Sequence, residues 1–147
     1  MDAEWLRKVC LAFPGTTEQI QWGYDLVFKV GGKMYAVTPL EPAPVCLSFK
    51  TSPEKFAELT ERQNVIPAPY LARAQWVALQ TRDALGREEL AGLLRESYEM
   101  ILRKLPKKML QAIFAGRSAV REGRKRHRAE KNAKRLKKES LKKVHTR

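Results

Sequence analysis

The stretch DLVFKVGGKMYAVT, residues 25–38, decides how this chain folds. Over residues 25–30 apolar side chains alternate with less apolar ones, which is the period of a half-buried strand. Gly31-Gly32 follows, and two glycines supply the positive φ angles that tight hairpin turns favour. The chain then returns over residues 33–38. The stretch therefore predicts an antiparallel β-hairpin.

Outward from this hairpin, the sequence predicts two more strands and several helices. Strands are expected at residues 45–50 and 76–79, where apolar residues again alternate or run together. Apolar spacing, a Ser-Pro-Glu helix start and breaks at proline or glycine predict helices at residues 3–12, 53–62, 87–105 and 107–115. Because hairpin-linked strands form antiparallel sheets, the fold class is α+β, an antiparallel sheet with helices packed on one face.

The charge of the chain is concentrated at its C-terminal end. The 147 residues carry a net charge of +13 and have a pI near 10.0. Residues 117–147 hold 14 Lys or Arg against three acids, a net +11, which leaves +2 for residues 1–116. We therefore divide the chain into a nearly neutral domain, residues 1–116, and a basic tail, residues 117–147. Such an asymmetry indicates a polyanionic partner.

The basic tail (residues 117–147) is too polar to fill a core. Each of its acids precedes a base by four residues, which favours helix, whereas Gly123 costs about 1 kcal/mol and the uncompensated charges repel one another. We expect a helical or partly disordered segment that becomes ordered on an anion. Its candidate phosphate-binding residues are Arg124, Lys125, Arg126, Arg128, Lys131, Lys134, Arg135, Lys137 and Lys138. A solvated tail that only keeps the protein in solution is the alternative interpretation.

The domain offers four further basic candidates. Lys29 and Lys33 flank the glycine turn, so this hairpin resembles a basic wing that contacts a phosphate backbone. Lys50 and Arg73 are similar candidates. Ordinary solvated surface lysines are the alternative interpretation for all four.

Three aromatic residues are candidates for stacking on nucleobases if they are exposed: Trp22, Tyr70 and Trp76. A place in the core is the alternative for each of them. Trp76 alternates with Val77 in a way that suits a buried strand face.

Nothing in the sequence predicts catalysis. Residues 1–116 contain no histidine, and no P-loop, GxSxG or HExxH pattern is present. Cys10 and Cys46 are lone cysteines, which we interpret as small buried residues of a reducing compartment. We therefore expect no catalytic residue, no metal and no cofactor.

The start of the chain carries two acids where a secretory signal would have basic residues, and no apolar run is long enough to span a bilayer. A cytoplasmic location without a membrane partner is expected. A monomer is favoured, although the sequence leaves the oligomeric state open.

Six segments of the domain, in this order, resemble the MmcQ/YjbR family of small bacterial proteins. They are CLAFPG at 10–15, Trp22 with FKVGGK at 28–33, LSFKTSPE at 47–54, APYL at 68–71 leading into AQW at 74–76, SY at 97–98, and LPKK at 105–108. The resemblance implies a frataxin-like (CyaY-like) sandwich with a double-wing arrangement and a DNA-binding role, but no catalytic residue set. The basic tail lies outside it.

The sequence thus favours a non-enzymatic nucleic-acid-binding protein, with DNA favoured over RNA and the tail making salt-sensitive phosphate contacts. Two alternatives stay open. One is an adaptor that binds an acidic protein or a ribosomal surface through the tail. The other is a small-ligand protein or unrecognised enzyme with a pocket between sheet and helices.

Overall fold

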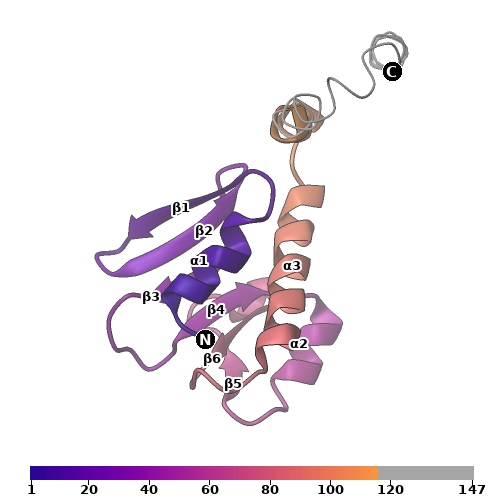
Figure 1. The fold of residues 1–147 in the computed structure, drawn as a ribbon. Coiled ribbons are helices and arrows are strands. Elements are labelled where there is room, and N and C mark those ends of the chain that lie inside the picture. Colours follow the sequence, from indigo (N-terminus) through magenta and orange to yellow (C-terminus); the bar gives the residue numbers. More distant parts are fainter. Residues whose placement is uncertain (116–147) are drawn as a thin grey trace, which may run out of the picture.

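A computed structural model of the chain describes residues 1–115, which form a six-stranded antiparallel sheet with helices on one face (Figure 1). The strand order is β1-β2-β3-β4-β6-β5. The strands are β1 (Thr16–Gln21), β2 (Asp25–Val30), β3 (Lys33–Pro39), β4 (Leu47–Lys50), β5 (Val65–Pro67) and β6 (Trp76–Leu79). The helices are α1 (Ala3–Leu11), α2 (Pro53–Leu59), the short 3₁₀ helix η1 (Ala72–Ala74), α3 (Arg87–Arg103) and a last segment at 107–115. The predicted α+β class is confirmed.

The central hairpin forms as the sequence predicts. Val30 of β2 pairs with Lys33 of β3 across a two-residue turn in which Gly31 and Gly32 have φ angles of +60° and +78°. The pairing shifts by one residue between Phe28 and Lys29, a β-bulge of the kind that bends a strand. The hairpin therefore leaves the plane of the rest of the sheet, as the raised β1–β2 arm in Figure 1 shows.

The helix starts follow their capping residues. The Asp2 carboxylate accepts from the Trp5 amide at 2.8 Å at the start of α1, and the Ser52 hydroxyl accepts from the Lys55 amide at 3.2 Å at the start of α2. However, α2 ends at Leu59, three residues before the predicted end. The Thr60 hydroxyl donates to the Phe56 carbonyl at 2.7 Å there, which satisfies a carbonyl of the last turn.

Two strands were not expected from the sequence. Strand β1 lies at one edge of the sheet and consists mostly of polar residues, and even Ile20 is 60% exposed. Strand β5 lies at the other edge, is three residues long and ends at Pro67. Edge strands of this kind lack the apolar alternation that identifies a strand in a sequence.

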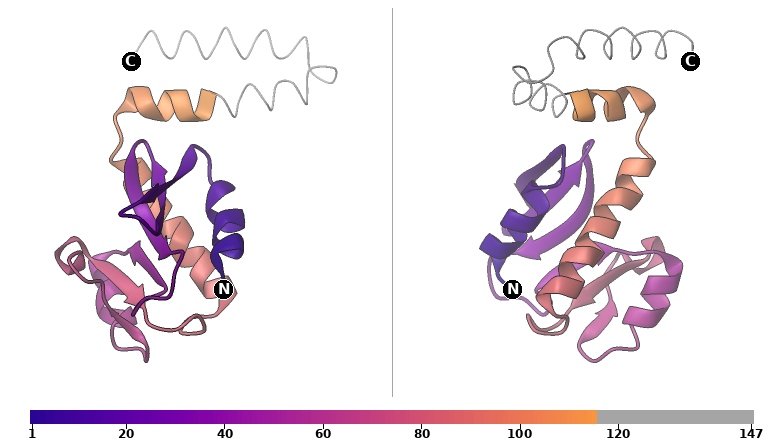
Figure 2. Two further views of the ribbon diagram at one scale, coloured as in Figure 1. Left: turned by 90° about the vertical axis from the view of Figure 1, so that its left-hand side faces the viewer. Right: turned by 45° about the vertical axis from the view of Figure 1, so that its right-hand side comes forward.

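The main core lies between the sheet and the helices (Figure 2). Its centre is an aromatic group in which the Phe13 and Tyr98 rings stack at 5.1 Å and Tyr35 meets the edge of Tyr98 at 5.8 Å. The Tyr98 hydroxyl donates to the Pro14 carbonyl at 2.6 Å, which joins α3 to the loop after α1. Helix α3 thus covers the core on strands that all precede it in the sequence.

The opposite face of the sheet carries none of the α-helices that the structure describes. A smaller cluster lies there, built from Ala68, Trp76 and Ala78 and partly covered by the loop that contains η1. Trp76 is buried, as its alternation suggests, but on this face and not in the main core. We refer to this side as the open face.

Candidate nucleic-acid interface

The sheet brings two of the predicted basic residues to the open face. Lys29 pairs with Met34 across β2 and β3, and Lys50 pairs with Trp76 across β4 and β6. Met34 and Trp76 both belong to the cluster on the open face. Because directly paired residues of an antiparallel sheet share a face, Lys29 and Lys50 emerge on this side. Lys29 donates to the Gln19 side chain at 3.1 Å, which directs its ammonium over β1.

Lys50 brings Arg73 into the same region. The Lys50 ammonium donates to the Ala74 carbonyl at 2.8 Å, at the end of η1, and Arg73 is the exposed residue immediately before it. Burial, together with the charge of Lys104, lowers the pKa of Lys50 below its ordinary value. The Lys50 ammonium thus lies between the C-terminal end of α3 and the end of η1, one residue beyond Arg73.

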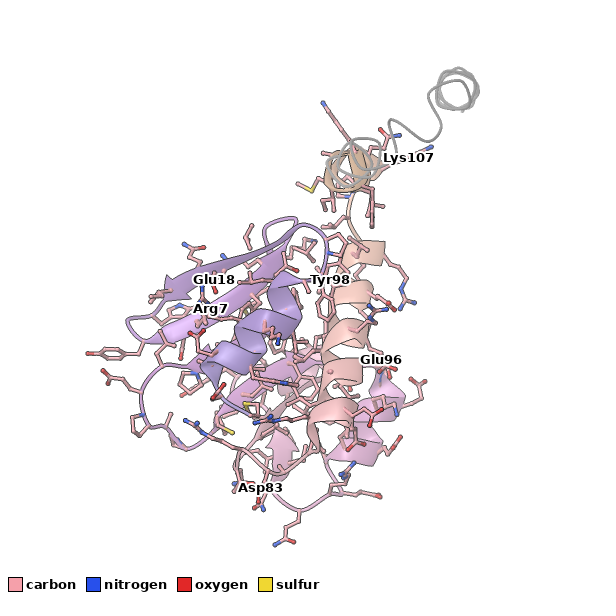
Figure 3. All side chains as sticks on the ribbon, in the orientation of Figure 1. Arg7, Glu18, Asp83, Glu96, Tyr98 and Lys107 are labelled. Atoms are coloured by element: carbon pink, nitrogen blue, oxygen red, sulfur yellow. The ribbon has the colours of Figure 1, made fainter. Side chains whose placement is uncertain are left out.

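Lys33 does not share this face. It pairs with Val30, a residue of the main core, so it belongs to the helix side of the hairpin. The adjoining turn lies against the end of α3, since a Cβ atom at Gly31 would be only 2.6 Å from the Leu105 side chain. Lys33 therefore lies at the end of the molecule where residues 103–108 supply four more bases and no acid. Figure 3 shows Lys107 beyond the end of α3, at the start of the helical segment 107–115.

A groove beside Lys50 limits how basic this surface is. It has a volume of about 710 Å³ and is lined by residues of both signs. Its bases are Lys50, Lys55, Arg103 and Lys104, and its acids are Glu54, Glu58, Glu96 and Glu99. The groove is therefore a poor phosphate site, and the favourable positions lie outside it, at Lys29, Arg73, Lys107 and Lys108.

The candidate residues of the tail lie outside the described residues. They are Arg124, Lys125, Arg126, Arg128, Lys131, Lys134, Arg135, Lys137 and Lys138. Their contribution rests on their charge and density alone.

The predicted aromatic residues separate into two groups. Trp76 is 4% exposed and unavailable for stacking, so the alternative for this residue, a buried strand face, is confirmed. Trp22 is 67% exposed and Tyr70 is fully exposed. Both line one hollow of about 520 Å³ on the open face, whose apolar lining includes Met34, Val37, Val45 and Leu71. Asp25 and Ser48 are the polar residues of this lining. We call it the aromatic hollow.

Sequence reasoning found the two rings but not the aromatic hollow itself. Its lining comes from β2, β3, β4 and three loops, so no single motif marks it. Asp25 and Lys104 were likewise missed, because a lone charge at the end of a strand or a helix is common in any sequence.

Both cysteines of the described residues are weak nucleophiles at neutral pH. Burial raises the pKa of the Cys10 thiol to about 12, and burial also raises the pKa of Cys46, which is only partly buried. Within residues 1–115 there is no group of three His, Cys, Asp or Glu side chains placed to hold a metal ion. In the same range, no helix combines the length and apolar character needed to cross a bilayer.

Both the sequence and the fold of this chain are similar to those of known proteins. The sequence model of the YjbR family matches residues 11–100. The crystal structure of DR2400, a Deinococcus radiodurans protein with a DUF419 domain, aligns with 76% of this chain and 87% of its own, at 32% identity and a TM-score of 0.69. A Pseudomonas syringae protein aligns over 68% of this chain and 98% of its own, at 19% identity and a TM-score of 0.56, and so supports the fold alone. No curated protein matches the chain.

Proposed function

The chain belongs to the YjbR family, and from that premise we propose that it binds nucleic acid, DNA in the first place, without catalysing a reaction. The observation that carries the proposal is the convergence of basic side chains at one end of the domain. Lys29 emerges there on the open face and Lys33 on the helix side, and the Lys50 ammonium donates to the carbonyl of Ala74, the residue after Arg73. The described chain leads from the same end into residues 117–147, with their net charge of +11.

The physical basis is the release of counterions from phosphates. Each phosphate that a lysine or arginine neutralises frees about 0.7–0.9 of a counterion, so affinity falls steeply with salt whatever the base sequence. The tail supplies most of this charge, and the domain fixes the position of the first contacts.

The test is a fluorescence-anisotropy titration of duplex and single-stranded DNA at low and moderate salt. The full chain should bind both probes at low salt, and a chain that ends at residue 116 should bind far more weakly with a flatter salt dependence. Absence of binding by the full chain at low salt would refute the proposal. An unchanged curve for the shortened chain would show that the tail makes no contact.

A second experiment separates the contribution of the domain. Replacing Lys29 and Arg73 by glutamine should reduce the salt slope by about 0.7 for each lost contact with a single strand. Lys8→Gln is the matched control, because Lys8 is exposed on α1, on the helix side of the sheet. A protein partner that is retained after nuclease treatment would instead favour the adaptor function.

A further inference from the structure

The aromatic hollow has the chemistry of a site for a flat, partly polar ring. Trp22 and Tyr70 provide two exposed aromatic side chains at its wall, and Met34 and Val37 contribute an apolar surface. Asp25 places a carboxylate beside them. An aromatic wall with a hydrogen-bond acceptor at its edge suits a nucleobase, because every base has a π-face and most carry an amino group.

Both aromatic residues have an uncommon backbone conformation. Trp22 has a φ angle of +52° and Tyr70 one of +66°. Glycine or asparagine is the usual residue at such positions, and a bulky side chain there is uncommon. Positions of this kind concentrate at ligand-binding sites. That two large apolar side chains occupy such positions, both facing solvent beside one hollow, favours a ligand over chance exposure.

The charged side chains around the aromatic hollow determine how a ligand would be oriented in it. Lys29 lies opposite Met34 of the lining, Lys50 lies two residues beyond Ser48, and Arg73 lies two residues beyond Leu71. Asp25 lies four residues before Lys29 on β2, roughly 13 Å away along an extended strand. The phosphates of a ligand would therefore lie along the basic side chains of this face, and its aromatic ring would be turned toward Asp25.

We infer that the aromatic hollow receives an unpaired nucleobase from a single-stranded segment whose phosphates lie along Lys29 and Arg73. This inference rests on the proposed function and adds to it a preference for single strands. In a duplex the faces of each base are covered by its neighbours and its amino group is engaged in pairing. Only an unpaired base can offer its face to Trp22 and Tyr70 and its amino group to Asp25.

The test uses the full chain and three fluorescent probes: a short oligodeoxycytidine, an abasic strand of equal length, and a duplex. The oligodeoxycytidine should bind at least about 5-fold more tightly than the abasic strand, which supplies phosphates without bases. Cytosine is chosen because its amino group can donate to Asp25. Equal binding of the base-bearing and abasic strands would overturn the inference.

Variants then assign the effect to the aromatic hollow. Trp22→Ala or Tyr70→Ala should weaken binding of the oligodeoxycytidine about 10-fold and leave binding of the abasic strand unchanged, whereas Trp22→Tyr should restore most of the affinity. Tyr24→Ala is the matched control, since Tyr24 is 59% exposed in the same turn but does not line the hollow. Circular dichroism verifies that each variant is folded.

The possible failures are distinguishable. If single strands bind but Trp22→Ala has no effect, or if Tyr24→Ala has the same effect as Trp22→Ala, the inference about the hollow fails and the proposed function stands. If no probe binds, including the abasic strand and the duplex at low salt, the proposed function itself fails.

Discussion

Ser97 shows how much one buried hydroxyl contributes at the scale of a residue. It is fully buried on α3, and its hydroxyl contacts the Lys50 carbonyl of β4 at 2.5 Å and the Leu93 carbonyl at 2.9 Å. Ser97→Ala would leave the Lys50 carbonyl without this donor, so we expect a loss of about 1–2 kcal/mol in the free energy of unfolding. Urea denaturation followed by fluorescence measures it, and an unchanged midpoint would contradict the expectation.

The ion pair between Arg7 and Glu18 makes the stability of the protein depend on pH. Arg7 donates to Glu18 through Nε and Nη2, at 2.8 Å each (Figure 3), and these hydrogen bonds lower the pKa of Glu18. A carboxylate with a lowered folded-state pKa stabilises the protein above its unfolded pKa, and this stability is lost as the pH falls through the folded value. Below a pH of about 4.5, the wild type should therefore lose more stability than Glu18→Gln. Parallel pH dependences of the two urea midpoints would contradict this.

At the scale of an element, the β2–β3 turn contains two glycines in different surroundings. Both have positive φ, but a Cβ at Gly31 would meet Leu105 at 2.6 Å, whereas a Cβ at Gly32 would meet nothing within 4 Å. Gly32→Ala should cost about 1–2 kcal/mol for its backbone conformation, and Gly31→Ala should cost more because it also displaces a buried leucine. Thermal melts of the two variants compare them directly. Equal losses would mean that the turn does not pack on the end of α3.

The elements also show which features a sequence reveals. The hairpin at 25–38 and the helix at 87–103 were predictable because one face of each is buried and the other is not, which leaves a period in the sequence. Strands β1 and β5 were not predicted because their residues are of the kinds found in strands at the edge of a sheet. Polar side chains and a proline prevent further pairing there, and the same residues remove the signal.

The candidate interface, too, was predictable only in part from the sequence. Lys29, Lys50 and Arg73 could be named from the sequence as basic residues near turns, but their proximity depends on pairing between β4 and β6 and on the path of the loop before β6. The sequence favoured a buried Trp76, but only the structure places it on the open face and outside the main core, because both faces of β6 are buried.

At the scale of the whole molecule, residues 1–115 form a continuous hydrophobic core. Its buried members run from Leu6 to Leu105, and Leu110 and Ile113 add the last partial contacts. A chain that ends at residue 116 should therefore keep the thermal midpoint of the full chain at moderate salt, where charge repulsion is screened. Calorimetry of both chains measures this. A clear fall in the midpoint would show that residues 117–147 contribute to the stability of the domain.

The link between Tyr98 and Pro14 has a consequence for synthesis on the ribosome. It joins positions 84 residues apart, and all six strands emerge from the exit tunnel before the helix that carries Tyr98. Until that helix follows, the apolar side of the nascent sheet lacks the contacts that α3 makes with it, and contacts between distant positions form slowly. Folding should thus finish only after the codon for Leu105 is well past, and a stalled, shorter nascent chain should remain bound by chaperones.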